Sequence, residues 1–191
     1  MSKNRLEAFS DGVIAILITI MVLELRVPRE PTLAALVPVT PVLLSYVLSF
    51  VFLGIYWSNH HHLLQAVEQV NGGVLWANLH LLFWLSLTPF TTAWMGENHF
   101  ASTPAALYGV VLLFAAIAYF ILARTLLSIH KKDSVLATAL GKDFKGKISM
   151  LIYLVAIPLA FVRSWLACAL YILVAVMWLV PDRRIEKEIA E

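Results

Sequence analysis

Long runs of apolar residues, separated by short polar stretches, dominate the pattern of this chain. Most of these runs are close to the length of about 20 residues that an α-helix needs to cross a bilayer. Glycine and proline stand at nearly every boundary between the runs. The pattern predicts six transmembrane helices, over residues 8–25, 39–64, 72–96, 104–127, 148–162 and 165–180.

The last two predicted helices are the shortest, and only Arg163 and Ser164 separate them. They are marginal for full spans, so a re-entrant hairpin is an alternative, with the C-terminus on the same side in both cases. The second predicted helix is long enough to tilt or to extend past the bilayer. Pro89 and Pro158 are expected to interrupt their helices. Because no internal repeat is visible, we expect one six-helix domain over residues 1–191.

Composition supports a membrane protein rather than a large soluble one. Hydrophobic residues make up 61% of the chain and charged residues 14%, whereas soluble domains carry roughly 45–50% apolar and about 25% charged residues. The single cysteine, Cys168, excludes an internal disulfide. The net charge of +2, with dispersed basic residues, gives no indication of nucleic-acid binding. The expected fold class is all-α and integral to the cell membrane.

The distribution of basic residues predicts the orientation. With six spans, eleven of the 14 basic residues fall on the side of the two termini, and only Arg26, Arg29 and Arg163 fall opposite. The positive-inside rule places the richer side, and therefore both termini, in the cytoplasm. The eleven are Lys3, Arg5, Arg124, Lys131, Lys132, Lys142, Lys145, Lys147, Arg183, Arg184 and Lys187. The basic residues from 142 to 147 are also placed to contact anionic membrane lipid, although the positive-inside rule explains them equally well.

Polar residues gather at one depth of the predicted bundle, at the cytoplasmic ends of the first three helices. Asp11 is the unusual member, because a carboxylate at or near the bilayer is costly unless it is paired or hydrated. We expect it to accept hydrogen bonds from a histidine, Asn78 or Ser10. The layer comprises Arg5, Ser10 and Asp11 from the first helix, Asn59 and His60 to His62 from the second, and Trp76, Asn78 and His80 from the third.

Three roles for this polar layer remain open from the residues themselves. It can fasten the first three helices together, since satisfied buried networks fix helix packing. It can sense protons through histidine. A metal site is the weakest reading, because consecutive histidines point about 100° apart on a helix and no HExxH motif is present.

The first helix also carries a separate apolar face. With Asp11 at zero and about 100° per residue, Ile16, Thr19, Ile20 and Leu23 fall between about 80° and 180°. Thr19 supplies the only hydroxyl along this face. The face suits ordinary helix packing, and the periodicity alone does not establish a pore.

Three short motifs resemble the transmembrane protein 175 family, the endosomal and lysosomal potassium channels and their prokaryotic relatives. The first is Arg5-x-x-x-Phe9-Ser10-Asp11, which is similar to the RxxxFSD signature of that family. The others are Tyr56-Trp57-x-x-His60-His61, and Trp76-x-Asn78-Leu79 with Leu87-x-Pro89-Phe90. The likeness covers the first three helices closely, and extends to the remaining helices only in layout.

The resemblance implies a prokaryotic potassium-permeable cation channel that assembles as a homotetramer. It implies that the first helix lines a central pore, while the motif residues Arg5, Phe9, Ser10 and Asp11 pack against the second and third helices. Ile16 then forms the hydrophobic constriction, and Thr19 or Ile20, followed by Leu23, forms the next layers. His60, His61, Trp76 and Asn78 belong to the supporting network. No cofactor or metal is implied, and K⁺ is the permeant ion together with other monovalent cations.

The absence of a TVGYG filter makes selectivity by a carbonyl cage unsupported. We therefore expect a dewetting constriction at Ile16 and a modest preference for K⁺ over Na⁺. The alternatives are a secondary transporter, a membrane enzyme that uses Asp11 with His60 to His62, and a non-conducting structural membrane protein. No GxSxG or HExxH motif supports an enzyme.

Overall fold

The computed structural model describes residues 2–67, 69–130 and 144–179, and within these ranges the regular elements are all helical. Five helices are long and apolar enough to cross a membrane, counting α3 and α4 together, and α8 is shorter. The helices are α1 (Lys3–Leu23), the 3₁₀ helix η1 (Leu33–Val39), α2 (Thr40–Gln65), α3 (Gly72–Ser86), α4 (Thr88–Glu97), α5 (Ser102–Ile129), α7 (Phe144–Val162) and α8 (Ser164–Leu179).

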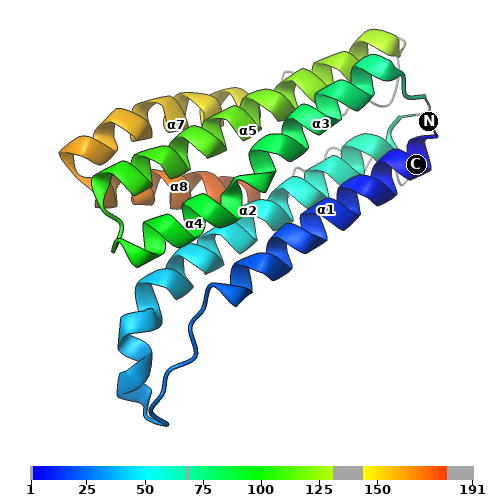
Figure 1. Ribbon diagram of the computed structural model, residues 1–191. Helices are drawn as coiled ribbons and strands as arrows, with labels where there is room; N and C mark the ends of the chain where they lie inside the picture. The colour runs from blue at the N-terminus through cyan, green and yellow to red at the C-terminus, as the bar shows by residue number, and fades with distance from the viewer. Residues whose placement is uncertain (1, 68, 131–143, 180–191) are drawn as a thin grey trace.

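The helices form one elongated bundle with α1 along its edge (Figure 1). α1 contacts α2, α3 and α4, whereas α5, α7 and α8 pack with one another behind them. The end of the bundle where α1 and α3 begin and α2 finishes is called the first end below, and the opposite end is called the second end. The two sides of α1 are therefore flanked by different helices, α2 on one side and α3 with α4 on the other.

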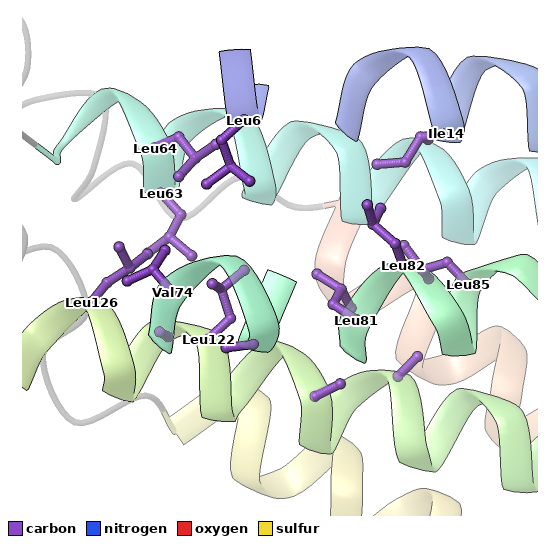
Figure 2. Packing of buried hydrophobic residues seen from close by; sticks show 14 of the residues in the cluster. Leu6, Ile14, Leu63, Leu64, Val74, Leu81, Leu82, Leu85, Leu122 and Leu126 are labelled. Carbon is purple, nitrogen blue, oxygen red and sulfur yellow. The ribbon is translucent and has the colours of Figure 1, made fainter. Parts of the chain in front are cut away.

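Two apolar clusters make up the interior. The first joins α1, α2, α3 and α5, and Figure 2 shows Leu6 and Ile14 of α1 pointing toward leucines of α2 and α3. The second joins α2, α4, α5, α7 and α8 around Tyr108 and Tyr171. Buried serines and threonines lie among these side chains, so the helices are held by hydrogen bonds as well as by packing.

The third predicted span, over residues 72–96, is divided into two helices, and the interruption expected from Pro89 is confirmed. α3 finishes at Ser86 and α4 begins at Thr88, with Pro89 in its first turn. Proline has no backbone N–H and its ring crowds the preceding turn, so a helix readily restarts there. The expectation for Pro158 was wrong, because α7 runs through it without a break. Pro158 lies on the exposed side of α7.

The remaining predicted spans are confirmed as helices, with ends that move by a few residues. α1 begins five residues earlier than predicted, so the motif residues Arg5 to Asp11 are all helical. The sixth predicted span matches α8, but its predicted end at residue 180 lies outside the described residues, as do the basic residues between 131 and 143 and beyond 180.

Candidate functional site

The first helix has one sealed face and one open face. The sealed face faces the bundle and repeats every three or four residues: Leu6, Ser10, Ile14, Leu17 and Met21. None of these side chains is more than 7% exposed. Because the helix turns about 100° per residue, the opposite face points away from every other described helix.

The four residues predicted from the helical wheel all lie on this open face. Ile16 is 57% exposed and Leu23 is 79% exposed, and Thr19 and Ile20 are exposed as well. Ordinary packing inside the subunit is therefore not the role of this face. The Thr19 hydroxyl donates a hydrogen bond to the carbonyl of Ile16 (2.9 Å), so the lone pairs of Thr19 Oγ1 remain available on the outside.

A chain of buried hydrogen bonds joins α1, α2 and α3 near the first end. Ser10 Oγ donates to the Leu6 carbonyl at 2.8 Å, so it accepts from Asn78 Nδ2 at 2.9 Å. Asn78 Oδ1 then accepts from Nε2 of His60 at 2.7 Å, which assigns the proton of His60 to Nε2. All three side chains are fully buried. The structure therefore joins three members of the expected polar layer, Ser10, His60 and Asn78, without Asp11.

A second set of polar contacts runs along the seam between α1 and α2. Lys3 Nζ donates to the Gln65 carbonyl (3.3 Å), Glu7 Oε1 contacts His61 Nδ1 (2.9 Å), and Asp11 Oδ1 accepts from Trp57 Nε1 (3.0 Å). Successive contacts are four residues apart on both helices, which is about one turn along each of these two antiparallel helices. The Trp57 and His61 rings also stack, with an interplanar angle of 16°.

The partner of Asp11 differs from the expectation. Asp11 accepts from Trp57, and not from a histidine, Asn78 or Ser10. The reason is geometric: Asp11 and Ser10 are adjacent, so they point about 100° apart on the helix. Since Ser10 faces α3, Asp11 faces the α2 seam instead.

Three predicted network residues stay outside the network. Trp76 is 75% exposed on the outer side of α3, Phe9 is 51% exposed, and Arg5 is exposed beside them on the open side of α1. Sequence reasoning missed Lys3, Glu7 and Gln65, and took Trp57 only as part of a motif. The regular spacing of Lys3, Glu7 and Asp11, and of Trp57, His61 and Gln65, was the signal that would have revealed the seam.

A second buried polar cluster lies toward the other half of the bundle and was not predicted. Thr92 Oγ1 donates to the Thr88 carbonyl (2.6 Å), so it accepts from Ser49 Oγ (2.6 Å), which in turn accepts from the Tyr108 hydroxyl (3.0 Å). These groups join α4, α2 and α5, and Thr92 also lies 3.9 Å from the sulfur of Met21 on α1. α4 is therefore held by directional bonds directly after the break at Leu87.

The site offers no arrangement for metal chemistry among the described residues. No group of three or more histidine, cysteine or acidic side chains comes together there. His60 Nδ1 is the one fully enclosed side-chain nitrogen or oxygen in the described part of the chain that lacks a hydrogen-bond partner.

At the second end, Arg26 and Glu97 form an exposed ion pair (3.1 Å) that links the segment after α1 to the end of α4.

The fold and this site define a class, a multi-pass helical membrane protein whose first helix is fastened by polar contacts on one side and open on the other. Comparison with known families makes the assignment specific. Residues 5–89 match the family described as "Endosomal/lysosomal potassium channel TMEM175". A potassium channel from a Chryseobacterium strain is 52% identical over the whole length of both chains. The chain belongs to the TMEM175 family.

Further relatives and a solved structure support the same family assignment. A potassium channel of Chamaesiphon minutus is 31% identical over 91% of both chains. The crystal structure of a lysosomal potassium-selective channel TMEM175 homologue from the same organism has a TM-score of 0.79, with 28% identity over 93% of this chain and 96% of that one. The mouse endosomal/lysosomal proton channel TMEM175 is 28% identical, and the chain spans 30% of its length. The protein is thus an ion channel in a membrane, not an enzyme, and it needs no cofactor.

Proposed function

We propose that four copies of this chain assemble around a central pore lined by α1, and that the pore conducts K⁺ passively across the cell membrane. The observation that carries this proposal is the division of α1 into a sealed face and an open face. The open face contains Ile16, Thr19, Ile20 and Leu23, the residues to which the resemblance to the family assigns the pore. The richer distribution of basic residues puts both termini, and the first end of the bundle, in the cytoplasm.

Ile16 forms the narrowest apolar ring in this proposal. Four isoleucine side chains at one level exclude water from a narrow passage, and a dry passage stops ions without any plug. Ile20 and Leu23 continue the apolar lining toward the second end, and Thr19 interrupts it with oxygen. The seam contacts of Glu7 and Asp11 hold α1 against α2, so that the ring keeps its register.

The test is K⁺ flux into liposomes that contain the purified protein, with Ile16→Ala beside the wild type. We expect passive flux that follows the K⁺ gradient and rises about tenfold or more in Ile16→Ala, because the smaller side chain lets the constriction hydrate. Leu154→Ala on the exposed side of α7 is the matched control and is expected to behave as wild type. Absence of flux in both proteins, with tetramers present, would contradict the pore assignment.

Thr19 is the residue that we assign to selectivity. Its proton is already donated to the Ile16 carbonyl, so it presents acceptor lone pairs to a partly dehydrated cation. Four hydroxyls replace a hydration shell only in part, which limits the preference for K⁺ over Na⁺ to a modest one. Thr19→Val keeps the shape and removes the oxygen, and we expect the K⁺/Na⁺ permeability ratio from bi-ionic potentials to fall to about 1.

Ile20→Val, on the same face of α1, is the control for Thr19→Val and is expected to leave the ratio unchanged. An unchanged ratio in Thr19→Val, in protein that still conducts, would remove the selectivity role from this residue while leaving the pore in place.

A further inference from the structure

Besides the open face of α1, two stripes of large apolar side chains are exposed on the flanks of the subunit. On α2 the stripe consists of Leu43, Val47, Phe50 and Trp57, with Gly54 between the last two. On α3 and α4 it consists of Trp76, Leu79, Phe83 and Phe90. In the α2 stripe, with Gly54 counted, successive members are four or three residues apart. In the α3–α4 stripe the steps are three, four and seven residues. An average step of about 3.5 residues is typical of helices that pack along their length.

The two stripes lie on different sides of α1. The α2 stripe adjoins the seam in which Trp57 contacts Asp11, and the α3 stripe lies on the helix that contacts α1 through Asn78. A cyclic tetramer with α1 at its centre brings one flank of each copy against the opposite flank of the next, because ring interfaces join two different surfaces. The flank on α2 must then meet the flank on α3 and α4 of a second copy.

The depth of the contact follows from one hydrogen bond. His60 of α2 and Asn78 of α3 touch, so they lie at the same level of the bundle. The two helices are antiparallel, so six residues back along α2 and six residues forward along α3 lead to the same new level, about 9 Å away. Gly54 is therefore level with Trp84, directly beside Phe83. In a ring around the membrane normal every copy keeps its residues at the same depth.

The shapes at this level are complementary. A Cβ atom added at Gly54 would meet no atom within 4 Å in its own subunit, so the α2 stripe is hollow there. Phe50 and Trp57 stand one turn to either side of the hollow, and both are about half exposed. The Phe83 ring is 54% exposed on the other flank. Small residues such as glycine leave room at helix interfaces in membranes, and the room above Gly54 can receive a large ring from a second helix.

We propose that the α2 stripe of one subunit packs against the α3–α4 stripe of its neighbour, with the partner subunit's Phe83 seated over Gly54 between Phe50 and Trp57. The occupant of each flank is thus a second copy of this chain. The inference rests on the proposed tetramer around α1 and adds the surface that closes the ring. The exposed apolar faces of α7 and α8 remain for lipid.

Cysteine cross-linking tests the contact, and the single native cysteine makes the background simple. In a Cys168→Ala chain, Gly54→Cys and Phe83→Cys are introduced separately and together, and native membranes are oxidised with copper phenanthroline. On a denaturing gel the double variant is expected to give a ladder up to the tetramer, because each subunit links to two neighbours. Each single variant is expected to stay monomeric. The control pair, Leu154→Cys with Leu173→Cys on α7 and α8, is expected to give no ladder.

Two outcomes would overturn the inference. One is a double variant without a ladder, although its mass in mild detergent is that of a tetramer. The other is dimer formation by Gly54→Cys alone, which would mean that two α2 helices face each other. In either case K⁺ flux tests the channel separately, so the inference can fail while the proposed function stands. A wild-type mass below that of a tetramer would instead defeat the assembly itself.

A second variant checks the hollow without cross-linking. Gly54→Phe places a ring in the space that the partner subunit's Phe83 would occupy, and its Cβ atom meets no other side chain within 4 Å in its own subunit. We expect its tetramer to dissociate about tenfold more readily than wild type in a dilution series. The smaller Gly54→Ala should remain tetrameric. A tetramer of unchanged stability in Gly54→Phe contradicts the proposed seat.

Discussion

Asn78→Leu is expected to lose most of the stability of the folded channel. The amide of Asn78 both accepts from His60 and donates to Ser10, and all three groups are fully buried. Leucine has the same branched arrangement of non-hydrogen atoms but leaves the Nε2 proton of His60 and the Ser10 oxygen without that partner. Each unsatisfied buried polar group costs about 1–3 kcal/mol, so the two together cost about 2–6 kcal/mol. Thermal unfolding in detergent, followed by tryptophan fluorescence, measures the loss.

A matched replacement on the same helix separates this effect from a general sensitivity of α3. Ser86→Ala, at the exposed end of the same helix and outside the α3–α4 stripe, is expected to change the unfolding temperature very little. If Asn78→Leu unfolded at the wild-type temperature, the buried chain would not be holding α1, α2 and α3 together.

Gly109→Ala is expected to be the second most damaging single change. Gly109 lies on α5 directly against the hydroxyl end of Tyr171 on α8, and a Cβ atom there would overlap that phenol and press on Ile157. Tyr171 is held in place, because its hydroxyl donates to the Ala105 carbonyl at 3.0 Å and its ring is completely buried. Overpacking of this kind costs about 1–3 kcal/mol, and the lost hydrogen bond adds about 1 kcal/mol.

A double-mutant cycle with Tyr171→Phe tests the stated cause. Removing the hydroxyl takes away the group that a Cβ atom at residue 109 meets first, so Gly109→Ala should cost less in the Tyr171→Phe background than in wild type. Gly72→Ala, where an added Cβ meets nothing within 4 Å, is the control. Additive effects of Gly109→Ala and Tyr171→Phe would show that the two positions do not interact.

The apolar runs sufficed to predict the number and order of the long helices, because hydrophobic length is the dominant constraint inside a bilayer. The break between α3 and α4 was only partly visible. Pro89 indicated an interruption, but a proline does not by itself decide whether a helix ends or continues, as the unbroken course of α7 through Pro158 demonstrates. After the break, α4 is held to α2 by the hydrogen bond between Ser49 and Thr92.

The candidate site was predicted in its position but not in its pairings. Topology alone brought Ser10, His60 and Asn78 to one level, and the structure joins them. To predict which neighbour each side chain meets, one must know which face of α1 is sealed. In a membrane, the pattern of apolar and polar positions defines that face only loosely. For this reason Trp57 was not recognised as the partner of Asp11, and the exposed position of Trp76 was not foreseen.

The hydrogen bond from Thr19 to the Ile16 carbonyl also bears on how the protein is made. A newly inserted subunit exposes the open face of α1 to lipid before it meets any other copy. Because Thr19 already donates its proton within its own helix, that face adds no unpaired donor to the hydrocarbon. In the proposed assembly, a single subunit can therefore expose this face to lipid without an unpaired hydroxyl proton before it meets a second copy.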